Sequence, residues 1–270
     1  MVGVAGIHML IAAQGGPDLP TVDDFLPPEI LFQGTPFAIN RIILVRIVAT
    51  VAMLLILGVS AHRAKLIPGR WQGVLEMGVS FVRDNIVYEV MGALRGRRYV
   101  PMIATIFFTI LVFNLCGIVP GANIAATASV VMPLVFALWT MVQYWIAAVR
   151  EKGLGRFIRD EVFTPGVPWP VYILLAPIQI LELLVIRPLS LTIRLFANMI
   201  SGHLMVATCL AFAQYWMIES ADKLMGIPVG ATWFVGGLLM TCFEAFVAFL
   251  QAYVFAILST VYINLSYPEQ

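Results

Sequence analysis

The stretch "IILVRIVATVAMLLILGVS", residues 42–60, decides the fold class of this chain. A helix that rises 1.5 Å per residue needs about 20 such residues to cross roughly 30 Å of hydrocarbon. The chain around it has the same character, since 61% of its 270 residues are hydrophobic and only 11% are charged. A soluble domain carries roughly 25% charged residues. The sequence therefore predicts an all-α integral membrane protein.

Other apolar runs of comparable length lie at about 100–119, 130–148 and 230–264. A longer run, 171–217, would extend about 70 Å as one helix. It either breaks near Arg187 and Pro188 into two spans, or crosses once as a strongly tilted element. Proline favours a kink, but membrane helices tolerate it, so the local sequence leaves both arrangements open.

The charges of the connections indicate how the chain is oriented. Residues 1–40 carry acidic residues but no Lys or Arg, whereas 62–98 and 149–161 are rich in basic residues. The positive-inside rule then places the N-terminus outside and both basic connections, with the C-terminus, in the cytoplasm. This orientation is consistent with about five membrane crossings, provided that 171–217 crosses the membrane once. We therefore expect one membrane domain over 1–270, in which 171–217 and 230–264 form a tilted helical hairpin.

The first basic connection, 62–98, contains apolar residues at loose helical spacing. They are Val74, Met77, Gly78, Phe81, Val82, Val87 and Met91, with Asn85 among them. A cytoplasmic amphipathic helix lying on the membrane surface fits this spacing. A solvated connecting helix fits it equally well.

Three ionisable residues, Arg194, His203 and Glu244, lie well inside apolar stretches. A charge at the centre of a spanning helix costs about 2.5–3.5 kcal/mol on insertion scales, so such residues indicate function by default. The alternative for His203 and Glu244 is an ion pair that only fixes helix packing. Arginine keeps its proton, with a pKa above about 12, whereas histidine and glutamate can exchange protons once burial shifts them.

Helical periodicity groups polar residues around these charges. Residues within about 40° of Arg194 on a helix are Arg187, Ser190 and Asn198. On the last helix, Glu244 and Gln251 are seven residues apart and share a face, and small residues beside them permit close helix approach. Two such stripes on packed helices could hold a file of water. We also expect His203 and Glu244 to face each other, because each alone would be an unpaired polar group.

Three blocks of the chain resemble subunit a of the F-type ATP synthases. They are "FNLCGIVPGANIAATAS" at 113–129, "RLFANMISGH" at 194–203 and "FEAFVAFLQAYVFAILSTVY" at 243–262, within a resemblance that covers roughly 25–265. The resemblance implies that the essential arginine of the family is Arg194. The other positions that it implies on the proton path are Asn114, Asn198, Gln251 and the exchanged pair His203 and Glu244. Many relatives read "PIE" where this chain has Gln179, and the nearest carboxylate here is Glu182, about one turn later.

The resemblance also implies a function and partners. The chain would be the stator subunit of the membrane sector, with two proton half-channels facing the carboxylates of a rotor c-ring. Further partners would be peripheral-stalk b subunits, the soluble ATPase head and the lipid of a bacterial plasma membrane. We expect no nucleic acid, cofactor or metal, and ATP chemistry on other chains. The alternatives are a proton-coupled secondary transporter, which would predict an internal repeat with broken helices, and an intramembrane enzyme, for which no HExxH motif is found.

Overall fold

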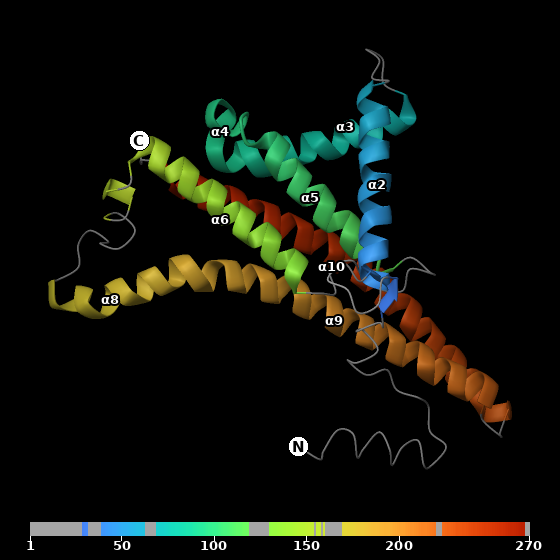
Figure 1. Cartoon of the computed structure of the whole chain (residues 1–270). Coiled ribbons are helices and arrows are strands. Elements are labelled where there is room, and N and C mark those ends of the chain that lie inside the picture. The colour runs from blue at the N-terminus through green and yellow to red at the C-terminus, as the bar shows by residue number, and fades with distance from the viewer. Residues whose placement is uncertain are drawn as a thin grey trace. The chain divides into compact units, whose positions relative to one another are not determined.

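The computed structural model describes residues 29–31, 39–62, 69–118, 130–153, 155–157, 159, 169–219 and 223–267. Figure 1 shows that these residues are almost entirely helical. A short antiparallel pair, β1 (Glu29–Leu31) and β2 (Ile39–Asn40), accounts for the strands of the described part. The helices are α2 (Arg41–His62), α3 (Arg70–Val82), η2 (Arg83–Tyr88), α4 (Glu89–Gly96), α5 (Val100–Leu115), α6 (Val131–Glu151), α8 (Trp169–Leu181), η3 (Glu182–Ile186), α9 (Arg187–Gln214), η4 (Tyr215–Glu219) and α10 (Lys223–Leu265).

Four helices of the described chain are long and apolar enough to cross a membrane. They are Ile42–Ser60, Val131–Glu151, Leu174–Glu219 and Leu224–Leu265. The helix predicted over 100–119 is the shorter apolar α5, which has 16 residues. It ends early because Asn114 and Leu115 accept the backbone bonds of a turn at residues 116–118. The all-α membrane class predicted from composition is confirmed.

The apolar run predicted over 171–217 forms one helical element without a break. Helices α8, η3, α9 and η4 follow one another directly, and 46 of these residues form a single apolar span. The π-helical turn η3 ends at Ile186, two residues before Pro188, whose ring would collide with the carbonyl four residues earlier in a regular α-helix. A π-turn pairs residues five apart and so avoids that collision. The tilt of this element in the membrane stays a prediction.

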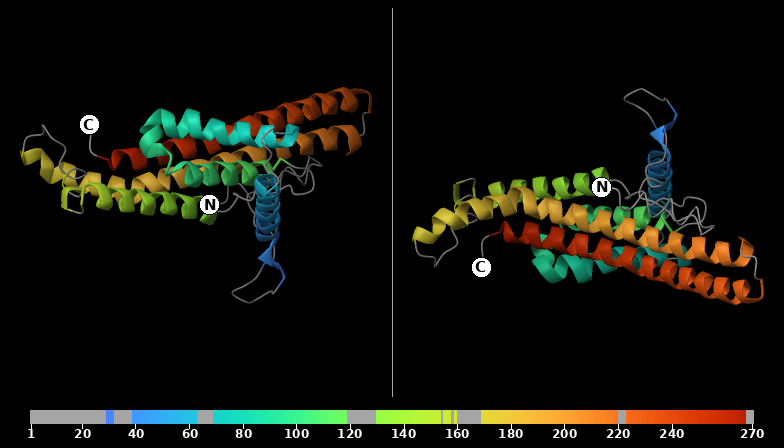
Figure 2. Two further views of the ribbon diagram at one scale, coloured as in Figure 1. Left: turned by 90° about the horizontal axis from the view of Figure 1, so that it is seen from above. Right: turned by 90° about the horizontal axis from the view of Figure 1, so that it is seen from below.

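The chain divides into two compact units, which we call the hairpin unit and the bundle unit. The hairpin unit holds the described parts of Met1–Ile47, Asn114–Ala128 and Ala197–Ala248. In it, the second half of α9 and the first part of α10 run side by side, as both views of Figure 2 show. Phe212 stacks on Trp233 with 4.8 Å between ring centroids. Gly230 allows this approach, because a Cβ there would collide with the side chain of Met217.

The bundle unit holds the described parts of Val48–Phe113, Ser129–Phe196 and Phe249–Gln270. Its core joins α5, α6, the start of α9 and the end of α10 through closely packed apolar side chains. The fully buried members include Ile86, Ile103, Ile110, Ala137, Ala252, Ala256 and Ile263. Inside this core, the hydroxyl groups of Thr140 on α6 and Ser259 on α10 are 3.3 Å apart, so buried polar groups are paired.

The first basic connection folds as α3, η2 and α4, and its apolar residues serve two purposes. Val82, Ile86 and Val87 are fully buried in the bundle core. Val74 and Met77, on the preceding turns of α3, are 63% and 71% exposed, which fits a helix that lies on the membrane surface. Gly92, with φ 73°, breaks the helix in a conformation that glycine adopts readily.

The buried core predicts a large difference between two aliphatic truncations. Ile103→Ala should destabilise the protein by about 2–5 kcal/mol, because Ile103 is fully buried in the bundle core and leaves a cavity. Leu94→Ala should have little effect on the isolated protein, since Leu94 is 99% exposed. Thermal unfolding of the purified chain in detergent measures both. Equal melting temperatures for Ile103→Ala and wild type would contradict the packing described here.

Candidate functional site

The predicted pair of titratable residues comes together in the hairpin unit. His203 on α9 and Glu244 on α10 approach to 3.4 Å between Nδ1 and Oε1. Both side chains are almost fully buried, with 8% and 6% of their surface exposed. Oε1 of Glu244 has no hydrogen-bond partner within the described chain. The pair can therefore share or pass a proton, and the carboxylate retains the capacity to accept one from elsewhere.

A groove of about 570 Å³ adjoins this pair within the hairpin unit. Its polar lining comes from His203, Glu244 and Thr241, and its apolar lining comes from residues such as Val206, Leu210 and Phe234. A water molecule occupies about 30 Å³ in the liquid, so several could line up in this space. The groove thus places two titratable side chains beside a space that water could occupy.

Gly202 positions the carboxylate of Glu244 by leaving room for it. A Cβ atom on Gly202 would lie 3.1 Å from Oε1 and 3.3 Å from the carboxyl carbon of Glu244. Few side chains accept contacts that close without shifting. The absence of a side chain at residue 202 is therefore part of the geometry that holds Glu244 beside His203.

Arg194 lies on the exposed side of α9, in the bundle unit. Leu191 and Leu195 on the same turns are buried in the core, whereas Arg194 and Ser190 are exposed. Within the described residues, Arg194 forms no ion pair. A guanidinium that is exposed on an apolar helix needs a partner beyond the described residues, because hydrocarbon cannot solvate it. Asn198, one turn further along α9, is half-buried.

Arg187 does not share the environment of Arg194, although helical periodicity grouped the two. Its side chain is largely buried, and its guanidinium lies over the rings of Tyr144 and Tyr262 at 5.9 and 5.4 Å. Glu182, at the start of η3, places Oε1 3.8 Å from Nε of Arg187. The π-turn η3 brings Glu182 and Arg187, which are five residues apart, onto the same side of the helix. Nothing in the local sequence identified the tyrosines, which lie on other helices.

The remaining predicted site residues are both buried amides. Gln251 is 7% exposed and lies on the buried face of α10 with Ala248 and Phe255. Asn114, at the end of α5, is fully buried. Among the residues that the structure describes, no group of three or more His, Cys, Asp or Glu side chains could hold a metal ion.

Comparison with known proteins identifies what this chain is similar to. The family profile described as ATP synthase A chain matches residues 42–264. The chain is 34% identical over 249 residues to the ATP synthase subunit a of Rhodococcus erythropolis, covering 92% of this chain and 89% of that protein. It is 38% identical to the ATP synthase subunit a of Hyphomonas neptunium, with 76% and 78% covered. It is 32% identical to that of Frankia alni, with 94% and 87% covered.

The close approach of Gly202 to Glu244 predicts an overpacking effect. Gly202→Ala should lower stability by about 1–3 kcal/mol, because the added methyl displaces the carboxylate. Gly236→Ala is the matched control on α10, since a Cβ there meets nothing within 4 Å. That control should be neutral or stabilising, as alanine favours a helix. Thermal unfolding in detergent compares the two variants. If Gly202→Ala melted at the same temperature as Gly236→Ala or higher, the contact would be refuted.

Proposed function

The chain belongs to the ATP synthase A chain family, the stator that provides the proton channel of the F-type membrane sector, and we propose which of its residues carry the proton path. Arg194 would be the fixed cation between two half-channels. His203 and Glu244 would carry protons on the outer half-channel, with Asn114, Asn198 and Gln251 as polar groups along the path. Glu182 would lie on the inner half-channel.

The exposure of Arg194 is the observation that carries this proposal. Within the described chain it has no carboxylate partner, although it lies among apolar residues on a helix that can span a membrane. A ring of small rotor subunits that presents one carboxylate per step would supply the missing partner. Arginine suits a moving partner, because its planar fork can bond a carboxylate from several directions without releasing its proton.

The outer half-channel is proposed from the buried pair and its groove. A proton arriving by water would reach His203 or Glu244, pass along the pair and neutralise a rotor carboxylate. The neutral carboxylate could then enter lipid, which a charged one could not. After nearly a full turn of the ring, the proton would leave by the inner path near Glu182, where Arg187 is held by Tyr144 and Tyr262.

The energetic reason for a permanent cation is to prevent a direct leak. Each charge that crosses 100 mV yields about 2.3 kcal/mol. If a proton passed between the half-channels without turning the ring, that energy would be lost as heat. A positive charge at Arg194 would repel protons there and attract each ionised rotor carboxylate.

The wider assembly follows from the same proposal. The chain is a multi-pass subunit of the ATP synthase complex, and we propose that its contacts are the c-ring and the peripheral-stalk b subunits. ATP would be made on the soluble head, with no ATP site on this chain. The membrane would be the bacterial plasma membrane, with the N-terminus outside and the C-terminus in the cytoplasm, as the loop charges favour.

Substitution of Arg194 tests the barrier. Arg194→Lys should abolish most coupled pumping, because a lysine that faces apolar surroundings in the membrane can lose its proton, as buried lysines do when their pKa falls to about 5–6. Arg194→Ala should abolish coupling and permit passive proton leak. Proton pumping by membrane vesicles, recorded with ATP hydrolysis, measures both effects. Arg97→Lys, at an exposed arginine outside the proposed path, is the comparison, and substantial pumping by both Arg194 variants would exclude the proposed role.

The exchange of the buried pair tests the outer half-channel. Glu244→Leu should slow ATP-driven pumping, because His203 loses its proton partner. The double exchange His203→Glu with Glu244→His should restore part of the lost rate, since the two groups touch and either order keeps one acid and one base. Pumping rates of the single and double variants in vesicles give the comparison. A double exchange no faster than the slower single variant would mean that the two residues do not act as a pair.

A further inference from the structure

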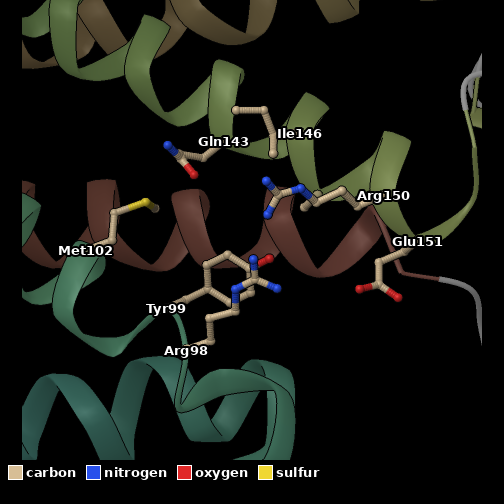
Figure 3. Close-up of a pocket in the computed structure, with 8 residues that line it drawn as sticks. Arg98, Tyr99, Met102, Gln143, Ile146, Arg150 and Glu151 are labelled. Atoms are coloured by element: carbon tan, nitrogen blue, oxygen red, sulfur yellow. The ribbon is translucent and has the colours of Figure 1, made fainter.

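A small cavity at the ends of α5 and α6 lies in the bundle unit and is not used by the proposed proton path. It has a volume of about 130 Å³ and is lined by Arg98, Tyr99, Met102, Gln143, Ile146, Ala147, Arg150 and Glu151. Figure 3 shows the guanidinium groups of Arg98 and Arg150 directed toward the same gap. Gln143, Ala147 and Arg150 are spaced so that they share one face of α6. The cavity therefore presents two forked cations and an amide to one small space.

The two arginines have no carboxylate paired with them. Arg98 lies over the ring of Tyr99 at 5.9 Å, as Arg95 lies over the ring of Tyr267 at 5.1 Å. Neither Arg98 nor Arg150 forms an ion pair within the described part of the chain. An aromatic ring does not neutralise a guanidinium group, so the N–H groups of both arginines can still donate to an anion.

The charge of the cavity favours an anion. Arg98 and Arg150 together outweigh the single carboxylate, Glu151, which lies at its edge. The tyrosine pair beside it adds no negative charge, since the hydroxyl groups of Tyr99 and Tyr267 are 3.0 Å apart and share a hydrogen bond. Burial, and then that hydrogen bond, raise the pKa of Tyr267 above its ordinary value. Two guanidinium groups facing one space suit a phosphate, which accepts several charge-assisted hydrogen bonds.

The apolar surroundings point to a phosphate that carries acyl chains. Ile146, at the cavity, is 40% exposed, and Val142 and Val149 on the neighbouring turns of α6 are each 41% exposed. Helix α6 is apolar enough to span a membrane and ends at Glu151, so the cavity lies where a spanning helix meets its basic connection. A free phosphate ion would need only the cations. A lipid would use the cations for its headgroup and the exposed apolar face for its chains.

We propose that the cavity formed by Arg98, Arg150 and Gln143 binds the phosphate headgroup of an anionic glycerophospholipid. The acyl chains would lie along the exposed apolar face of α6 that contains Ile146. The bound lipid would neutralise the two arginines and seal the junction between α5 and α6. This site is separate from the proposed proton path, so its failure would leave that proposal intact.

The test uses the intact ATP synthase complex, exchanged into phosphatidylcholine nanodiscs and then titrated with phosphatidylglycerol. Native mass spectrometry counts the lipids that stay bound. The double variant Arg98→Gln with Arg150→Gln should retain at least about tenfold less phosphatidylglycerol, since the loss of one hydrogen bond to a charged group corresponds to roughly that factor. Arg97→Gln is the matched control, because Arg97 is exposed in the same turn but does not line the cavity. Glu151→Gln should bind more tightly than wild type.

Inorganic phosphate, added without lipid and then in competition with it, distinguishes the two sources of the headgroup chemistry. Weak competition by phosphate supports a lipid site, because the acyl chains add affinity that phosphate lacks. If inorganic phosphate without lipid bound as tightly as phosphatidylglycerol, the lipid assignment would be overturned and an anion site would remain. If the double variant retained as much phosphatidylglycerol as Arg97→Gln, the site itself would be overturned. The same conclusion would follow if the double variant lost a peripheral-stalk subunit but kept its lipid. The single variants, each expected to weaken binding several-fold, serve if the double variant does not assemble.

Discussion

The contact between His203 and Glu244 illustrates the constraint on which this structure depends. A polar or charged group among apolar helices is costly unless another group satisfies it. In the hairpin unit, this constraint pairs a histidine of α9 with a glutamate of α10 and leaves residue 202 without a side chain so that the two can meet. In the bundle unit, it places Arg187 over two tyrosine rings and near Glu182, and pairs Thr140 with Ser259.

Arg194 departs from this pattern, and the function that we propose for it rests on that departure. The residues around it on α9 carry no charge that could pair with it, and within the described chain it forms no ion pair. We propose that a rotor carboxylate moving past is the partner, which would explain why the described part of the chain does not supply a fixed one. The same reasoning applies at the membrane edge, where Arg98 and Arg150 face a shared cavity without carboxylate partners and an anionic headgroup would satisfy them.

Much of this could be predicted from residue types and spacing. Composition predicted the helices, because apolar runs near the length of a bilayer have few other stable forms. Charges in the connections favoured one long element over 171–217, which Pro188 alone left open and which the continuous helix Leu174–Glu219 matches. The π-turn at Glu182 and the tyrosines over Arg187 could not be predicted, since the first depends on how a proline is accommodated and the second on helices distant in sequence. The early end of α5 depends on a backbone turn without a distinctive sequence.

The most direct test of the central claim is whether the exposed side of α9 around Arg194 meets the rotor. Cysteine can replace Ser190, which is exposed one turn before Arg194, and Thr192, which is 1% exposed and faces the core. After labelling with a short photoreactive maleimide in membranes that contain the whole complex, Ser190→Cys should cross-link to the small rotor subunit. Thr192→Cys should give no such product. A cross-link from Thr192→Cys but not from Ser190→Cys would contradict the account.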